Sequence, residues 1–217
     1  MKKILSLENI LEAWEVYFNM YPDVFSDLVE DFKLLPGVGE KTAERFAYSL
    51  IDKNEEDILK ISEDIVNFKK KIKHCEICGH LTDRNICNIC SDKTRDNSVI
   101  CIVENSKSVF MFEKTNNYSG LYHVINGLIS PIEDIGPENI NLDSLINKRI
   151  NDNLKEIIIA LNPSIEGETT SLYIQKKLEG KNIKISRLSY GIPIGSDIEY
   201  LDPIMLTKTL EDRKIIS

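Results

Sequence analysis

The chain has 217 residues, 42% of them apolar and 29% charged, which is enough for one large or two small domains that each bury a core. No apolar run approaches the roughly 20 residues of a membrane span, and the first residues lead into Glu8, Glu12 and Glu15 instead of a signal-peptide stretch, so we expect a cytoplasmic protein without a membrane partner. The net charge of −8 excludes a uniformly basic nucleic-acid binder, although residues 69–95 carry seven basic side chains against three acidic ones.

The first seventy residues show helical periodicity. Residues 7–20 place apolar side chains at helical spacing with glutamates on the other faces, which predicts an amphipathic helix. Further helices are expected from about Asp23 to Leu34, after Gly39 through Leu50, and over about 55–71. The last of these carries one apolar stripe, formed by Ile58, Ile61, Ile65 and Phe68.

The segment between the second and third of these helices is a candidate phosphate site. It reads Leu-Leu-Pro-Gly-Val-Gly-Glu-Lys-Thr-Ala, and Gly37 and Gly39 let its backbone bend tightly and approach another backbone. The unpaired amides at the start of the following helix attract an anion, and Lys41 and Arg45 lie on one face of that helix. The string resembles a helix-hairpin-helix motif, which predicts DNA binding without sequence specificity. An ordinary helical hairpin with a Pro-Gly turn is the alternative.

Four of the five cysteines are spaced as metal ligands. Two C-x2-C pairs separated by eight residues predict a closed tetrahedral zinc site that stabilises structure and activates no water; its ligands are Cys75, Cys78, Cys87 and Cys90. Redox-active cysteines or buried structural thiols are the alternatives. His74 and His80 flank the ligands, but four thiolates already complete a tetrahedron, so we expect these histidines beside the site or at the surface.

From residue 97 onward, short β-type runs alternate with helical ones. The runs 99–103 and 156–161 are almost continuously apolar, as in strands covered on both faces, and we expect Cys101 to be a core residue. Helices are expected over 106–113, 141–150, 167–179 and 202–213. This alternation predicts a small α/β domain with a mostly parallel sheet.

Acidic residues after two of these strands resemble the Toprim fold of topoisomerases and primases. Glu104 closes the first strand, and Asn162 to Glu168 stand where active Toprim enzymes carry Asp-x-Asp-x-Glu-Gly-Glu. Asn162 and Ser164 replace both aspartates, so the oxygens that hold Mg²⁺ are largely missing and we expect no catalysis. Glu166 and Glu168 remain, and they can equally act as helix N-terminal partners or interface contacts.

Taken together, the modules resemble the RecR family of recombination mediator proteins over roughly residues 26–216. The resemblance includes Tyr122-His123-Val124, Ser130-Pro131-Ile132 and the tail from Arg187 to Asp202. It implies an α+β multi-module fold with five parts: an N-terminal extension helix (1–25), a helix-hairpin-helix region (26–73), a four-cysteine zinc finger (74–92), a Toprim-like domain (97–190) and a Walker B-like C-terminal segment with a helix (191–217). The acidic extension, which holds Trp14, precedes the usual family start, and we expect it to pack as an extra helix.

The resemblance also implies a function. A family member would assemble as a ring-like dimer or tetramer around single- and double-stranded DNA, and with RecO and RecF it would help load RecA on strands covered by single-strand-binding protein. Lys41 and Arg45 match the family's DNA-binding residues, and the four cysteines match its ligands for one structural zinc ion.

Two enzymatic functions compete with this interpretation. A Mg²⁺-dependent nuclease or primase-like enzyme would use Glu104, Glu166 and Glu168, but the missing aspartates disfavour it. Nucleotide hydrolysis at the Walker B-like tail needs a phosphate-binding G-x-x-x-x-G-K-[ST] loop, and the sequence has none.

Overall fold

The computed structural model describes residues 21–189, 191–192 and 195–215, and the expected helix over 7–20 lies outside them. The chain divides into two compact units, Met1–Lys70 and Lys71–Ser217. Within the described residues, no helix is both long enough and apolar enough to cross a membrane.

The described part of the first unit is helical, as predicted. It contains α2 (Asp23–Lys33), α3 (Glu40–Ile51) and α4 (Glu55–Lys71). A small core of Val29, Ala43 and Ala47 holds α2 against α3, because alanines at i and i+4 let the two backbones come close. The apolar stripe predicted on α4 exists but is not covered by any described residue: Ile65 is 64% exposed and Phe68 is 63% exposed.

The second unit begins with the cysteine-rich module. Its strands β1 (Lys73–His74) and β2 (Leu81–Thr82) pair in antiparallel fashion, and the short helix α5 (Asn88–Ser91) follows. Its buried side chains are mainly cysteines, namely Cys75, Cys78 and Cys87, so the module has little apolar core of its own.

The rest of the second unit contains a four-stranded sheet in the order β4-β3-β5-β6, in which every neighbouring pair is parallel. Its strands are β3 (Asp96–Val103), β4 (Gly120–Val124), β5 (Glu156–Ala160) and β6 (Lys184–Arg187). The two apolar runs singled out in the sequence are the central strands β3 and β5, which confirms the predicted parallel sheet. Cys101, on β3, is 3% exposed and belongs to the core, also as predicted.

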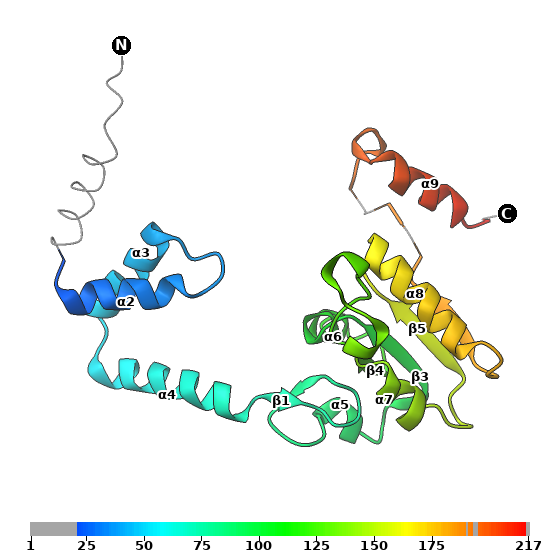
Figure 1. Ribbon diagram of the computed structural model, residues 1–217, viewed down its shortest axis with the longest axis horizontal. Coiled ribbons are helices and arrows are strands. Elements are labelled where there is room, and N and C mark those ends of the chain that lie inside the picture. The colour runs from blue at the N-terminus through cyan, green and yellow to red at the C-terminus, as the bar shows by residue number, and fades with distance from the viewer. Residues whose placement is uncertain (1–20, 190, 193–194, 216–217) are drawn as a thin grey trace, which may run out of the picture. The chain divides into compact units, whose positions relative to one another are not determined.

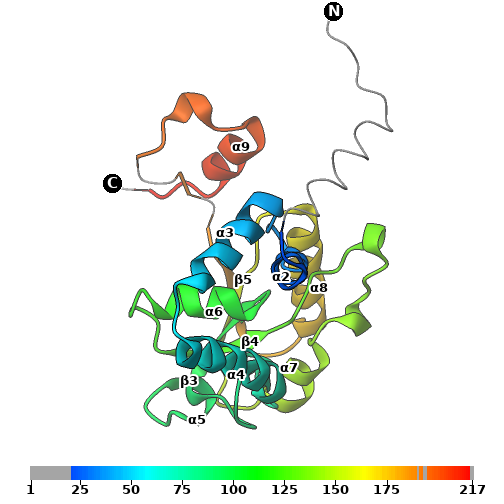
Figure 2. The same cartoon turned by 90° about the vertical axis from the view of Figure 1, so that its left-hand side faces the viewer.

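Helices cover both faces of this sheet (Figures 1 and 2). Val109 of α6 (Ser106–Glu113) packs with Cys101, Val103 and Val124 on one face. Side chains of α7 (Asp143–Lys148) and α8 (Ile165–Leu178) pack with Ile100 and Ile157 on the other. Helix α8 starts two residues earlier than predicted, because the Ser164 side chain caps it by accepting a hydrogen bond from the Gly167 amide.

Short elements complete the second unit. The 3-10 helices η1 (Pro131–Glu133) and η2 (Pro137–Asn139) lie between β4 and α7, and η3 (Ile198–Tyr200) precedes α9 (Pro203–Glu211). In the Walker B-like stretch, the carboxylate of Asp202 accepts hydrogen bonds from the Ile204 and Met205 amides and so caps α9. Asp202 therefore has a structural role at the start of this helix.

Candidate zinc centre and nucleic-acid hairpin

The hairpin between α2 and α3 leaves the start of α3 open. Gly37 has a φ of +81°, a conformation that favours glycine, and Gly39 is the N-cap of α3 with a φ of −90°. No side chain caps α3, so amides of its first turn are left for another acceptor. A Cβ atom added at Gly39 would meet nothing within 4 Å, so the packing of the hairpin does not require glycine at this position. The missing side chain instead leaves room for an outside group to approach the helix start.

Lys41 and Arg45 are exposed on α3, one helical turn apart. Neither has an ion-pair partner among the residues that the structure describes. Glu40, the neighbour of Lys41 in the sequence, is paired with Lys33, whose Nζ lies 2.8 Å from the Glu40 Oε2. The positive end of α3 and two available cations therefore lie together, which is the arrangement expected of a phosphate site.

The four predicted zinc ligands come together in the second unit. The Sγ atoms of Cys75, Cys78, Cys87 and Cys90 all lie within 4.8 Å of one another, and those of Cys78 and Cys87 are 3.6 Å apart. Four sulfurs at about 2.3 Å from a zinc ion in a tetrahedron are about 3.8 Å apart, so the cluster fits one zinc ion. In the described part of the chain it is the one group of three or more His, Cys, Asp or Glu side chains placed to hold a metal.

The surroundings of the sulfurs also suit thiolates. The Cys87 amide lies 3.4 Å from the Cys75 Sγ, and the Cys90 amide lies 3.4 Å from the Cys87 Sγ, so both donate to sulfur. A hydrogen bond from Cys78 lowers the pKa of the Cys87 thiol, and the same bond raises the pKa of Cys78. Packed this closely, four thiolates need a cation among them, and a bound Zn²⁺ would supply that charge and join the two halves of the module.

The zinc module is attached to the edge of the neighbouring sheet. The Val124 amide of β4 donates to the Cys78 carbonyl at 2.7 Å, and the Leu81 amide donates to the Ser106 Oγ at 2.9 Å. Gly79 has a φ of +75°, and a Cβ atom on it would lie 2.7 Å from the Val124 carbonyl oxygen. The module and the sheet thus form one packed structure.

His74 and His80 were expected beside the zinc site or at the surface, and not as ligands. The ring of His74 lies with its Nδ1 2.8 Å from the Gly79 carbonyl oxygen, and His80 packs its ring edge-on against Phe110 at 5.0 Å between centroids. Neither is a member of the four-cysteine cluster. His123, which the family resemblance includes but for which the sequence suggests no role, is fully buried on β4, with its Nε2 2.6 Å from the Asn141 carbonyl oxygen.

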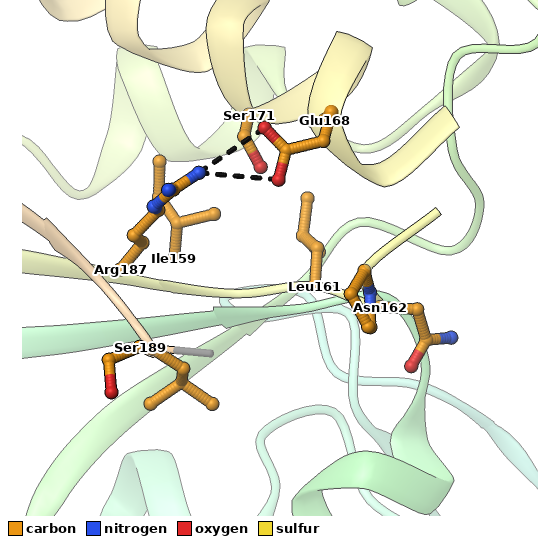
Figure 3. Close-up of a pocket in the computed structure, with 9 residues that line it drawn as sticks. Ile159, Leu161, Asn162, Glu168, Ser171, Arg187 and Ser189 are labelled. Carbon is orange, nitrogen blue, oxygen red and sulfur yellow. Dashed lines mark hydrogen bonds and ion pairs between the residues drawn. The ribbon is translucent and has the colours of Figure 1, made fainter. Parts of the chain in front are cut away.

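The three predicted Toprim carboxylates, those of Glu104, Glu166 and Glu168, each interact with different groups. The Asn162 side-chain amide donates to the Glu104 carboxylate at 2.7 Å, and Glu168 forms an ion pair with Arg187 of β6 at 3.2 Å. Figure 3 shows this ion pair at a pocket of about 200 Å³ beside β5 and β6. Glu166 lies in the first turn of α8, where its own amide and Ser164 lower the pKa of its carboxyl. The three carboxylates do not form a metal cluster in the described structure.

Gly167 allows the loop between β5 and α8, residues 161–164, to pack against the start of α8. A Cβ atom at this position would collide with the Asn162 carbonyl oxygen, a contact that no side chain tolerates. Glycine therefore allows the start of α8 to lie directly against the loop and fixes Asn162 within reach of Glu104.

Four family models match the chain in sequence order. The helix-hairpin-helix of RecR matches residues 25–69, the four-cysteine zinc finger domain of RecR matches residues 72–92, the Toprim domain matches residues 98–189, and the C-terminal region of RecR matches residues 191–214. Each match coincides with a structural feature described above: the open hairpin, the cysteine cluster, the parallel sheet and the segment that ends in α9.

Proposed function

The chain belongs to the RecR family, and from this premise we propose that it is a non-catalytic mediator that encloses DNA as a ring-like dimer or tetramer. The family gives it a part in DNA recombination and repair, with one structural zinc ion. Working in the cytoplasm with RecO and RecF, it would help load RecA on single strands covered by single-strand-binding protein.

The observation that carries the DNA-binding proposal is the open start of α3. Uncapped amides, the positive helix end, Lys41 and Arg45 all present positive charge in one place, and glycines leave the approach clear. A phosphate group fits these donors, whereas a base edge would need side chains that read its hydrogen-bonding pattern. We therefore assign the hairpin to the sugar-phosphate backbone of single- or double-stranded DNA.

The non-catalytic part of the proposal is supported by the Glu104 contact. Asn162 is neutral and directs its amide hydrogens toward the carboxylate, whereas a catalytic divalent ion would need anionic oxygen at both positions. The pairing of Glu168 with Arg187 engages a second carboxylate that such an enzyme would use. Both contacts argue against the alternative of a Mg²⁺-dependent nuclease or primase-like enzyme.

Self-association is supported by the uncovered face of α4. Ile61, Ile65 and Phe68, which lie on one side of this helix, are each between 47% and 64% exposed. Apolar area of this extent on one helix is costly to leave in water, and a ring of several copies would cover it. Native mass spectrometry of the zinc-loaded protein should give two or four chains, and a monomer at micromolar concentration would contradict the ring.

DNA binding is tested by charge reversal at the hairpin. Lys41→Glu and Arg45→Glu should each weaken binding to labelled single- and double-stranded oligonucleotides by about tenfold at low salt, and make the salt dependence shallower. Lys60→Glu, an equally exposed lysine on α4, is the matched control and should bind nearly as wild type. Unchanged affinity in both hairpin variants would remove the hairpin from the DNA site.

A further inference from the structure

The outer edge of β4 brings the zinc module next to a buried arginine. The Ile125 amide donates to the Val103 carbonyl of β3, and backbone direction alternates along a strand, so the backbone groups of Tyr122 and Val124 point to the other side. There the Val124 amide donates to the Cys78 carbonyl, and the Arg149 guanidinium donates to the Tyr122 carbonyl. Two residues along a strand span about 7 Å, so Arg149 and the zinc-binding loop are neighbours on one edge.

Arg149 carries a charge that its own surroundings do not balance. The residue is only 6% exposed, yet no carboxylate of a described residue lies within ion-pair distance of it. The acceptor of its guanidinium on β4 is a neutral carbonyl, that of Tyr122. Because a buried charge is costly unless it is paired, Arg149 needs a negative group nearby.

We propose that the zinc-bound cysteines are this negative group, so that Arg149 is the internal counter-charge of the zinc centre. One Zn²⁺ with four thiolates carries a net charge of about −2. Helix α5, which supplies Cys90, contacts β4, the strand to which Arg149 is bonded. The attraction acts in a largely water-free environment, where it is much stronger than at the surface.

Lys73 of β1 is another cation close to the ligands in the sequence, but it is less suited to this role. The exposed Lys73 hydrogen-bonds the Asn85 side chain, and solvent screens its charge far more than that of Arg149. Arg149 therefore couples the zinc centre to the Toprim-like sheet: loss of either charge leaves the other buried and unbalanced.

Arg95 offers a matched control on the same strand edge. Its guanidinium donates to the Gly120 carbonyl of β4 at 3.0 Å, as that of Arg149 does to Tyr122, but Arg95 has its own carboxylate partner in Glu113. Replacing Arg95 therefore disturbs the same strand without removing the proposed counter-charge of zinc.

The test is zinc affinity, measured by competition with a chromophoric chelator on the full-length protein. Arg149→Met, which keeps the volume and removes the charge, should raise the dissociation constant for zinc about tenfold or more. Arg149→Lys and Arg95→Met should stay within about threefold of wild type. Cobalt substitution should give the absorption of a tetrahedral tetrathiolate site in every variant, which shows that the four ligands are still in place.

Two results would overturn the proposal. One is a folded Arg149→Met protein that holds zinc as tightly as wild type. If Arg149→Met does not fold, Arg149→Lys decides: an affinity near wild type supports the charge, whereas a tenfold loss shows that the guanidinium shape matters and the charge does not.

Discussion

Gly79 shows how closely the zinc module is seated on β4. Replacement with alanine forces a side chain into a positive φ and against the Val124 carbonyl and the Asn141 side chain, at 2.7 and 2.6 Å. We expect Gly79→Ala to lower the free energy of unfolding by about 3 kcal/mol or more. Gly180 has a similar φ of +80° with nothing within 4 Å, so Gly180→Ala should cost only about 1–2 kcal/mol. Equal losses in denaturant unfolding at saturating zinc would contradict the close packing.

His123 should make stability depend on pH. Burial lowers the pKa of its imidazole to about 4 from the ordinary 6.5, with smaller effects from the Asn141 carbonyl and Arg149. Between these two values the unfolded chain binds a proton that the folded chain does not, so the stability is complete above pH 6.5 and falls as the pH drops toward 4.

The contribution of His123 is measured as a difference in slope. From pH 6.5 to pH 4, the free energy of unfolding of wild type should fall more steeply than that of His123→Gln, by up to about 1.4 kcal/mol per pH unit. Acid release of zinc affects both proteins and cancels in the comparison. Parallel curves for the two proteins would show that His123 is protonated in the folded state as readily as in the unfolded one.

At the scale of elements, we expect the zinc module to depend on its metal for stability. Its buried set is mostly cysteine, so little apolar area remains to hold residues 74–92 once zinc is gone. We expect one zinc per chain by metal analysis, and faster amide exchange in this segment after chelation or in Cys75→Ser and Cys90→Ser. Helices α2 and α3 have a separate core and should stay protected. Less than half an equivalent of zinc in freshly purified, reduced protein would contradict the site.

Most helices and strands could be predicted from the sequence, but the contacts between distant segments could not. Periodicity placed α4 and α6 at their observed bounds, and the cysteine spacing identified the cluster, because these signals are local in sequence. The burial of Arg149 and the contact between Asn162 and Glu104 arise only when distant segments meet, so no local pattern carries them. The apolar stripe of α4 was predicted correctly as a pattern, but a pattern does not say whether the same chain covers it.

At the scale of the whole molecule, the hairpin, the zinc module and the sheet have different proposed roles. In the proposed function, the hairpin would offer positive charge to a phosphate backbone, and Asn162 would occupy the place of a catalytic metal ligand. The zinc module is bonded to the edge of the sheet. A net charge of −8 disfavours general attraction to DNA, so binding should depend strongly on the hairpin. We therefore expect a protein that holds DNA and leaves it intact.

The most direct test of that claim is one gel of supercoiled plasmid incubated with zinc-loaded protein and Mg²⁺ or Mn²⁺ at low salt. Wild type should retard the plasmid without nicking it, Glu104→Ala should behave identically, and Lys41→Glu should retard it much less. Metal-dependent nicking by wild type that disappears in Glu104→Ala would contradict the claim, and so would equal retardation by Lys41→Glu.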